Sequence, residues 1–182
     1  MRMETGRRRL LKQTGMVLGL LVLSPVSGLI SPLTLLADSF PRPAKKDRCP
    51  VCGMFVHKYP HWMAGYVFTD GTKAFHCSPK CFFHNLFHLD KYHPGKALDD
   101  LKVIWVTDYY TARPVNARDP EMRFVAGSTL VGPMGWDIVP VKGLQCAETL
   151  SRDYFGQEIL AFGEVTEEHI QGARKGGGRV TK

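Results

Sequence analysis

The 182-residue sequence lacks the motifs that identify several large enzyme classes. It has no glycine-rich phosphate-binding loop, no dinucleotide-binding fingerprint and no serine-hydrolase nucleophile motif. Asp108, Tyr109 and Tyr110 offer acid–base groups, but no partner motif supplies a nucleophile. Nothing in the sequence therefore points to catalysis. With 44% hydrophobic and 23% charged residues, the chain instead suits one or at most two compact domains.

Acidic residues are few, because 17 Asp and Glu stand against 24 Lys and Arg, a formal net charge of +7. The excess of positive charge lies at the two ends of the chain. Residues 1–37 hold five basic residues and one acidic residue, and four more basic residues follow Ile170. Between Cys49 and Ile170 there are 11 basic and 14 acidic residues. The body of the protein is therefore mildly acidic, which disfavours a nucleic-acid partner.

The N-terminal segment combines adjacent arginines with an apolar stretch. Arg7-Arg8-Arg9-Leu10-Leu11-Lys12 resembles the twin-arginine signal, and an apolar region from Met16 to Leu36, interrupted by two prolines, follows it. We predict a signal peptide over residues 1–37 and export to the periplasm. An uncleaved signal is the alternative, because 21 residues are just long enough to anchor the chain in a membrane. The first cysteine, Cys49, has no apolar run directly before it, so lipid attachment is not expected.

The rest of the sequence predicts a small α+β domain over residues 49–171, between a linker at 38–48 and a disordered glycine-rich tail at 172–182. An Asp-Gly pair predicts a β-hairpin, and Ser78-Pro79 has the residues of a helix start. The elements expected from such local signals are strands at 66–68, 73–75, 102–110, 122–126 and 158–162, and helices from Ser78 to about Leu89 and over 147–155. Their order indicates two similar halves, each strand-strand-helix-strand.

Cysteines number only five, but four of them form two closely spaced pairs. Cys49-Pro-Val-Cys52-Gly-Met54 holds two thiols and a thioether, and Cys77-Ser-Pro-Lys-Cys81 holds two thiols that can share one helical face. Soft thiolate and thioether ligands favour Cu(I), whereas four thiolates in a tetrahedron favour Zn(II). Met54 favours copper, because a neutral thioether is a poor zinc ligand. Structural disulfides, a structural zinc site and an exchanging dithiol remain alternatives.

Other side chains could complete such a metal site. Met134 lies between glycines in Gly132-Pro-Met-Gly135, where core packing alone explains it poorly, and His76 directly precedes Cys77. His84 and His88 are four residues apart in the predicted helix, a spacing that can bind metal on one face. Each histidine is also explained as an exposed or hydrogen-bonded side chain without a metal.

Several of these segments, in this order, resemble the NosL family of nitrous-oxide reductase accessory proteins. The segments that carry the resemblance are Cys49-Pro-Val-Cys52-Gly-Met54-Phe-Val, Phe68-x-Asp-Gly71, Val106-Thr-Asp-Tyr-Tyr-Thr111, Phe124-Val-x-Gly-Ser128, Gly132-Pro-Met-Gly135 and Asp137-x-x-Pro140. The first segment and Phe75-His-Cys-Ser-Pro-Lys-Cys81 are similar, more loosely, to the short YHS and TRASH metal-binding modules.

The resemblance implies an exported Cu(I)-binding metallochaperone, not an enzyme. Such a protein supplies copper for the copper–sulfide centre of nitrous-oxide reductase and works with the membrane transporter complex of that system. The resemblance also implies a fold of two related α+β halves, similar to part of the organomercurial lyases. The alternative function is a structural zinc-binding interaction module that uses four cysteines, Cys49, Cys52, Cys77 and Cys81. A thiol–disulfide protein is the third.

The resemblance assigns the Cu(I) site residue by residue. Cys52, Met54 and Met134 correspond to the cysteine and methionine positions of the family motifs and are the first choice as Cu(I) ligands. This chain departs from the family pattern by its additional cysteine pair. The second set of candidate ligands, for copper or for zinc, consists of Cys49, His76, Cys77 and Cys81.

Overall fold

The structure, a computed structural model, describes residues 40–172. The predicted signal peptide at 1–37 lies outside the described residues, as does all but the first residue of the predicted tail. The described residues belong to one compact unit. Within residues 40–172, no helix is both long enough and apolar enough to cross a membrane.

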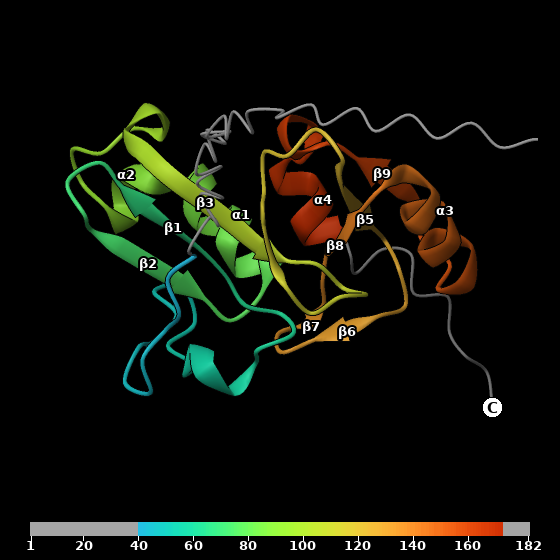
Figure 1. Ribbon diagram of the computed structural model, residues 1–182, viewed down its shortest axis with the longest axis horizontal. Coiled ribbons are helices and arrows are strands. Elements are labelled where there is room, and N and C mark those ends of the chain that lie inside the picture. The colour runs from blue at the N-terminus through green and yellow to red at the C-terminus, as the bar shows by residue number, and fades with distance from the viewer. Residues whose placement is uncertain (1–39, 173–182) are drawn as a thin grey trace, which may run out of the picture. The chain divides into compact units, whose positions relative to one another are not determined.

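Two small antiparallel sheets form the frame of this unit (Figure 1). The first half contains β1 (Ala64–Phe68), β2 (Lys73–His76), α1 (Pro79–Phe87), α2 (Leu89–Tyr92), β3 (Leu101–Thr107) and β4 (Pro114–Asn116). The second half contains β5 (Met122–Ala126), the hairpin of β6 (Val131–Gly132) and β7 (Gly135–Trp136), β8 (Val139–Lys142), α3 (Leu144–Asp153), β9 (Glu158–Leu160) and α4 (Glu167–Gly172). Short 3-10 helices lie at Val56–Lys58, Leu98–Asp100 and Phe162–Glu164.

The two halves repeat one topology. The strand order is β2-β1-β3 in the first sheet, with β4 added at its edge, and β8-β5-β9 in the second. In each half the first strand is central, the second pairs with it antiparallel, and a helix leads to the third strand on the other side. The prediction of an α+β fold with two strand-strand-helix-strand halves is therefore confirmed.

The β1–β2 hairpin forms where the Asp-Gly pair predicts it. Tyr66 pairs with Ala74, and Gly71 in the turn has a φ of +85°, which glycine adopts at little cost. Gly65 in β1 serves a different purpose: a Cβ there would lie 2.8 Å from the Ala74 carbonyl oxygen and 3.0 Å from the Trp105 ring. Because Gly65 has no side chain, β1 can pack closely against the Trp105 ring.

The predicted bounds of several elements were wrong, and the strand predicted over 158–162, for example, ends at Leu160. The strand predicted over 102–110 ends at Thr107, because the Asp108 side chain accepts hydrogen bonds from the Thr111 amide and hydroxyl and forms a turn. The helix predicted over 147–155 begins at Leu144, directly after Gly143, and ends at Asp153.

The hydrophobic core joins the two halves through α1. Phe82 and Phe83 on this helix are buried, and the Phe83 ring lies 5.1 Å from the Phe124 ring of β5 in an edge-to-face contact. The ring of Tyr66 on β1 lies 6.3 Å from that of Phe82. Contacts with both sheets therefore hold α1 in place.

Candidate metal centre

The first cysteine pair lies in a tight turn before β1. The Cys49 amide donates a hydrogen bond to the Met54 carbonyl, and the Gly53 amide donates one to the Cys49 carbonyl, both at 2.8 Å. Gly53 has a φ of +76°, which favours glycine. Arg48 donates from Nη1 to the Gly53 carbonyl at 2.9 Å. These bonds hold the thiols of Cys49 and Cys52 within 4.8 Å of each other.

The second pair lies at the junction of β2 and α1. The Ser78 hydroxyl accepts a hydrogen bond from the Cys81 amide at 3.4 Å, so Ser78 caps the helix as predicted. Cys77 directly follows β2, and Cys81 lies in the first turn of α1. This junction sets their sulfur atoms 3.9 Å apart.

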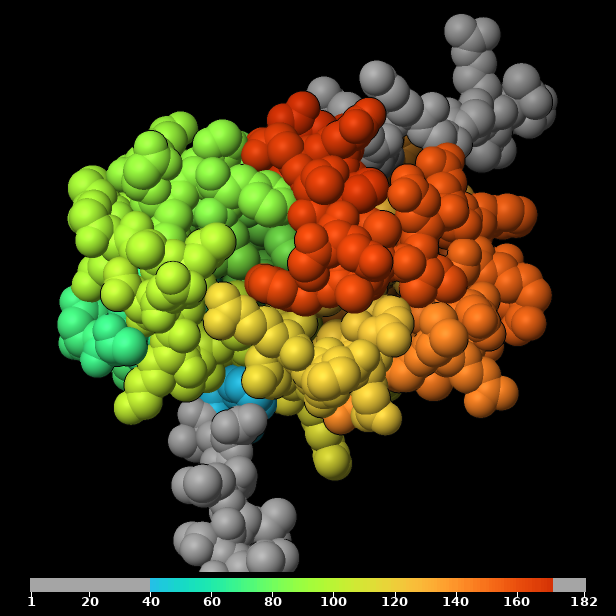
Figure 2. Space-filling view, turned by 90° about the horizontal axis from the view of Figure 1, so that it is seen from above, coloured from blue at the N-terminus to red at the C-terminus, as the bar shows by residue number. Residues whose placement is uncertain are grey.

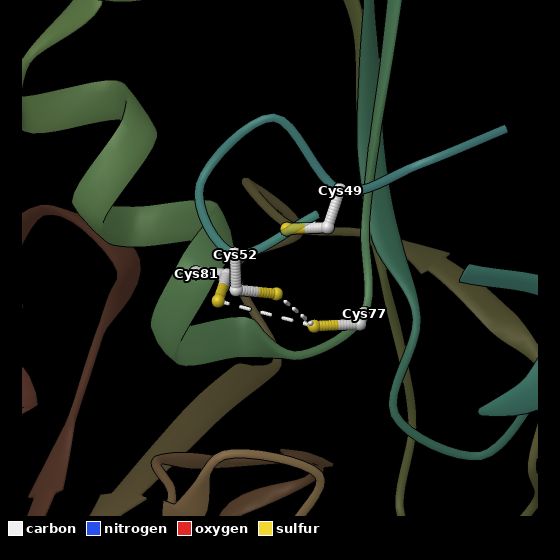
Figure 3. Close-up of side chains that lie close together, drawn as sticks. All are labelled: Cys49, Cys52, Cys77 and Cys81. Atoms are coloured by element: carbon white, nitrogen blue, oxygen red, sulfur yellow. Dashed lines mark hydrogen bonds between the residues drawn. The ribbon is translucent and has the colours of Figure 1, made fainter. Parts of the chain in front are cut away.

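The two pairs form one four-thiol cluster (Figure 3). All four Sγ atoms lie within 4.8 Å of one another, and those of Cys52 and Cys77 are 3.3 Å apart. Cys49, Cys77 and Cys81 are at most 4% exposed, whereas Cys52 is partly exposed. All four are free thiols. Such a group of convergent soft donors, open on one side, can hold a thiophilic metal ion.

Within the cluster, Cys49 becomes a thiolate most readily. Hydrogen bonds from Cys77 and Cys81 lower the pKa of Cys49 well below the usual range of a thiol. The hydrogen bonds to Cys49 raise the pKa of Cys77 and of Cys81, and burial raises both further. A bound cation would replace these protons, so metal binding to the cluster releases them.

The two candidate methionines lie in different surroundings. Met54 is partly buried and packs against the apolar residues around the four-thiol cluster. Met134, in the turn between β6 and β7, is 42% exposed. It lines a cavity of about 470 Å³ together with Val51, Cys81 and His84. The structure thus brings Met54 beside the cluster and Met134 to the cavity next to it.

His76 lies apart from the cluster. Alternate residues of a strand face opposite sides, so Phe75 and Cys77 pack with the cluster while His76 turns to the other side of β2. There its ring lies 5.3 Å from that of Tyr66, and burial lowers its pKa to about 4. The group of four converging ligands therefore consists of Cys49, Cys52, Cys77 and Cys81, and His76 is not part of it.

A buried carboxylate, which we did not identify from the sequence as a site residue, ties the β6–β7 hairpin to α1. Asp137 Oδ1 accepts hydrogen bonds from the backbone amides of Lys80, at 2.7 Å, and Ile138, at 3.0 Å. Burial raises the pKa of Asp137 to about 7. The sequence signal for this residue was its place in the Asp137-x-x-Pro140 segment. Asp137 helps to fix the segment that carries Met134 relative to the helix that carries Cys81.

Asp137→Asn is expected to make the stability of the protein less dependent on pH. The folded-state pKa is raised, so the folded state binds the additional proton, and stability is lost as pH rises through about 7. From about pH 6.5 to pH 8, the free energy of unfolding should fall by about 1 kcal/mol more in the unsubstituted protein than in Asp137→Asn. Urea titrations of the metal-free protein measure this difference. The exposed Asp99→Asn is the control; equal slopes for Asp137→Asn and the unsubstituted protein would contradict the assignment.

Comparison with known proteins identifies the family of this chain. The sequence profile of the NosL family matches residues 42–170. The crystal structure of the copper chaperone NosL from Shewanella denitrificans is similar in fold, with a TM-score of 0.59 and 23% sequence identity over 70% of this chain and 96% of that chain. No curated protein matches the chain. The family match extends over more than half of the sequence and includes both cysteine pairs and the β6–β7 hairpin, so the chain belongs to the NosL family.

Proposed function

We propose that this protein is an exported Cu(I) chaperone that supplies copper for the copper–sulfide centre of nitrous-oxide reductase. Membership of the NosL family supports the proposal, as does the similarity in fold to a solved copper chaperone. The observation that carries it is the convergence of four thiols at one largely buried point, with the Met54 side chain packed against their surroundings. Soft donors of this kind select Cu(I) over harder ions.

In this proposal, Cys52 and Met54 hold the copper and Met134 is the ligand that lets it leave. Cys52 is the partly exposed member of the cluster, and Met134 lies in the wall of the cavity that reaches Cys81. A neutral thioether can be displaced without taking up a proton. A ligand from the acceptor protein can therefore enter through the cavity and take over the ion while the thiols still hold it.

The proposal places the protein in the periplasm, on the strength of the predicted twin-arginine signal. Its partners are nitrous-oxide reductase and the membrane transporter complex of the same system. The protein binds and hands over a metal ion without making or breaking a covalent bond in a substrate, so it is proposed not to be an enzyme.

Copper delivery can be tested in a nitrous-oxide-reducing host that lacks its own copy of the chaperone. The unsubstituted protein should restore the copper content and activity of nitrous-oxide reductase, whereas Met134→Leu should restore about a tenth, the scale on which loss of a supporting metal contact acts. Val131→Leu, an exposed substitution on the same hairpin, is the matched control. A reductase fully loaded without the chaperone would contradict the proposal, and full delivery by Met134→Leu would contradict the role of Met134.

A structural zinc site is the second candidate function. The sulfur separations of 3.3 and 3.9 Å are close to the edge of a tetrahedral zinc–thiolate site, roughly 3.8 Å for Zn–S bonds of about 2.3 Å. Metal analysis of reduced protein offered equimolar Cu(I) and Zn(II), alongside Met54→Leu, separates the two functions. Copper that is bound by the unsubstituted protein and lost in Met54→Leu supports the chaperone. Zinc retained by both proteins with no copper bound, and unfolding when the zinc is removed, supports the structural site.

A further inference from the structure

Helices α1 and α4 meet along a second group of metal-ligating side chains, outside the four-thiol cluster. The two helices are in contact. In Figure 2, the C-terminal segment that contains α4 (red) lies between the first half of the unit (green) and the second (orange). His84 on α1 and His88 at its C-terminal end face Glu167, the first residue of α4.

The three side chains converge on one point. His84 Nδ1 lies 3.2 Å from Glu167 Oε1, and His88 Nε2 lies 3.1 Å from Glu167 Oε2. One ligand atom from each residue lies within 4.8 Å of the other two. The Gln171 amide donates a hydrogen bond to Glu167 Oε1 at 3.1 Å and so orients the carboxylate. All three side chains are between 32% and 43% exposed, so an ion in solution can reach them.

We propose that His84, His88 and Glu167 form a second metal site, which binds Zn(II) and links α1 to α4. Two imidazole nitrogens and one carboxylate oxygen are a donor set for divalent first-row ions and not for Cu(I). Zn–N and Zn–O bonds of about 2.0–2.2 Å in a tetrahedron separate the ligand atoms by roughly 3.4 Å, close to the two observed distances. Three protein ligands leave one position for water.

The position of this site relates it to the proposed copper site. His84 lines the same cavity as Cys81 and Met134. Cys81, His84 and His88 follow one another at spacings of three and four residues, so they share one face of α1. A Zn(II) ion there would fix α4 against the helix that carries Cys81. The inference does not depend on the proposed copper function.

Zn(II) titration of the reduced full-length protein, followed by calorimetry, tests the second site. The unsubstituted protein should bind one equivalent of Zn(II) more than Glu167→Gln does. If the variant still binds this equivalent, its Kd for the weaker binding event should be about 100-fold higher than that of the unsubstituted protein, as expected for loss of a ligand. Because the cysteines are the same in both proteins, any zinc that they bind cancels. Glu168→Gln, an exposed neighbour, is the matched control, and His88→Gln is a second variant that leaves α4 unchanged.

Co(II) as a spectroscopic probe gives an independent readout. The additional equivalent should show d–d bands without thiolate-to-cobalt charge transfer, and it should be absent in Glu167→Gln and His88→Gln. Equal stoichiometry and equal Kd in all four proteins would overturn the proposal and leave a hydrogen-bonded His-Glu-His group. That result would not affect the proposed copper function, because the four-thiol cluster is unchanged in every variant.

Discussion

Cys52→Ser is expected to lower the affinity of the protein for Cu(I) by roughly 100-fold to 1000-fold. Four-ligand structural zinc sites bind with about 10–16 kcal/mol, so one ligand of the four contributes about 2.5–4 kcal/mol, and each 1.4 kcal/mol is about a factor of ten. Serine has nearly the same size, but its hydroxyl stays protonated and is a poor ligand for a soft ion. Because Cys52 is the partly exposed member of the cluster, the fold should be retained. Competition with a chromophoric Cu(I) chelator under anaerobic conditions measures the affinity.

Cys146→Ser is the matched control for this prediction. Cys146 is exposed on α3 and does not belong to the four-thiol cluster, so its loss should leave the affinity for Cu(I) unchanged. An unchanged affinity in Cys52→Ser would contradict the proposed ligand set. Equal losses in the two variants would indicate that copper binds to thiols without regard to their position, as it would in an unfolded chain.

The parts of the fold that were predictable from the sequence depend on local signals. The hairpin of β1 and β2 follows from the Asp-Gly turn, and the start of α1 follows from Ser78-Pro79, because both depend on neighbouring residues. Strands β4 and β8 were missed. β4 is three residues long and begins with Pro114, and β8 contains Pro140, which lacks an amide hydrogen. Each is a strand because a distant partner, β3 or β5, pairs with it.

The candidate site was predictable to a similar extent. Each cysteine pair is local, but the approach of Cys52 to Cys77 joins residues 25 positions apart and requires the fold. The sequence also offered His76 beside Cys77 as a ligand, because it could not show that the two residues face opposite sides of the chain at the end of β2. Glu167 lies 83 residues from His84, in a segment without a recognisable motif, so the spacing of His84 and His88 alone did not reveal its partner.

Trp105→Ala is expected to lower the free energy of unfolding by about 3–5 kcal/mol, the usual cost of removing a large buried aromatic side chain. Trp105 on β3 is 1% exposed and packs in the same apolar cluster as Cys49, Cys77 and Cys81. Gly65, which lies beneath the ring, has no side chain that could fill the cavity. Urea unfolding of the metal-free protein measures the loss. Trp136→Ala, at a more exposed tryptophan, should cost less than about 1 kcal/mol.

Adding Cu(I) to the same variants tests whether Trp105 positions the thiols or only fills space. A ligand that binds the folded state alone stabilises it, by about 2.7 kcal/mol at 100 times its Kd. If the ring only fills space, a given excess of Cu(I) should stabilise Trp105→Ala as much as the unsubstituted protein. We expect a smaller gain in the variant, because the cavity loosens the apolar cluster against which Cys52 and Met54 pack. Equal gains would contradict this role and leave Trp105 as a core residue alone.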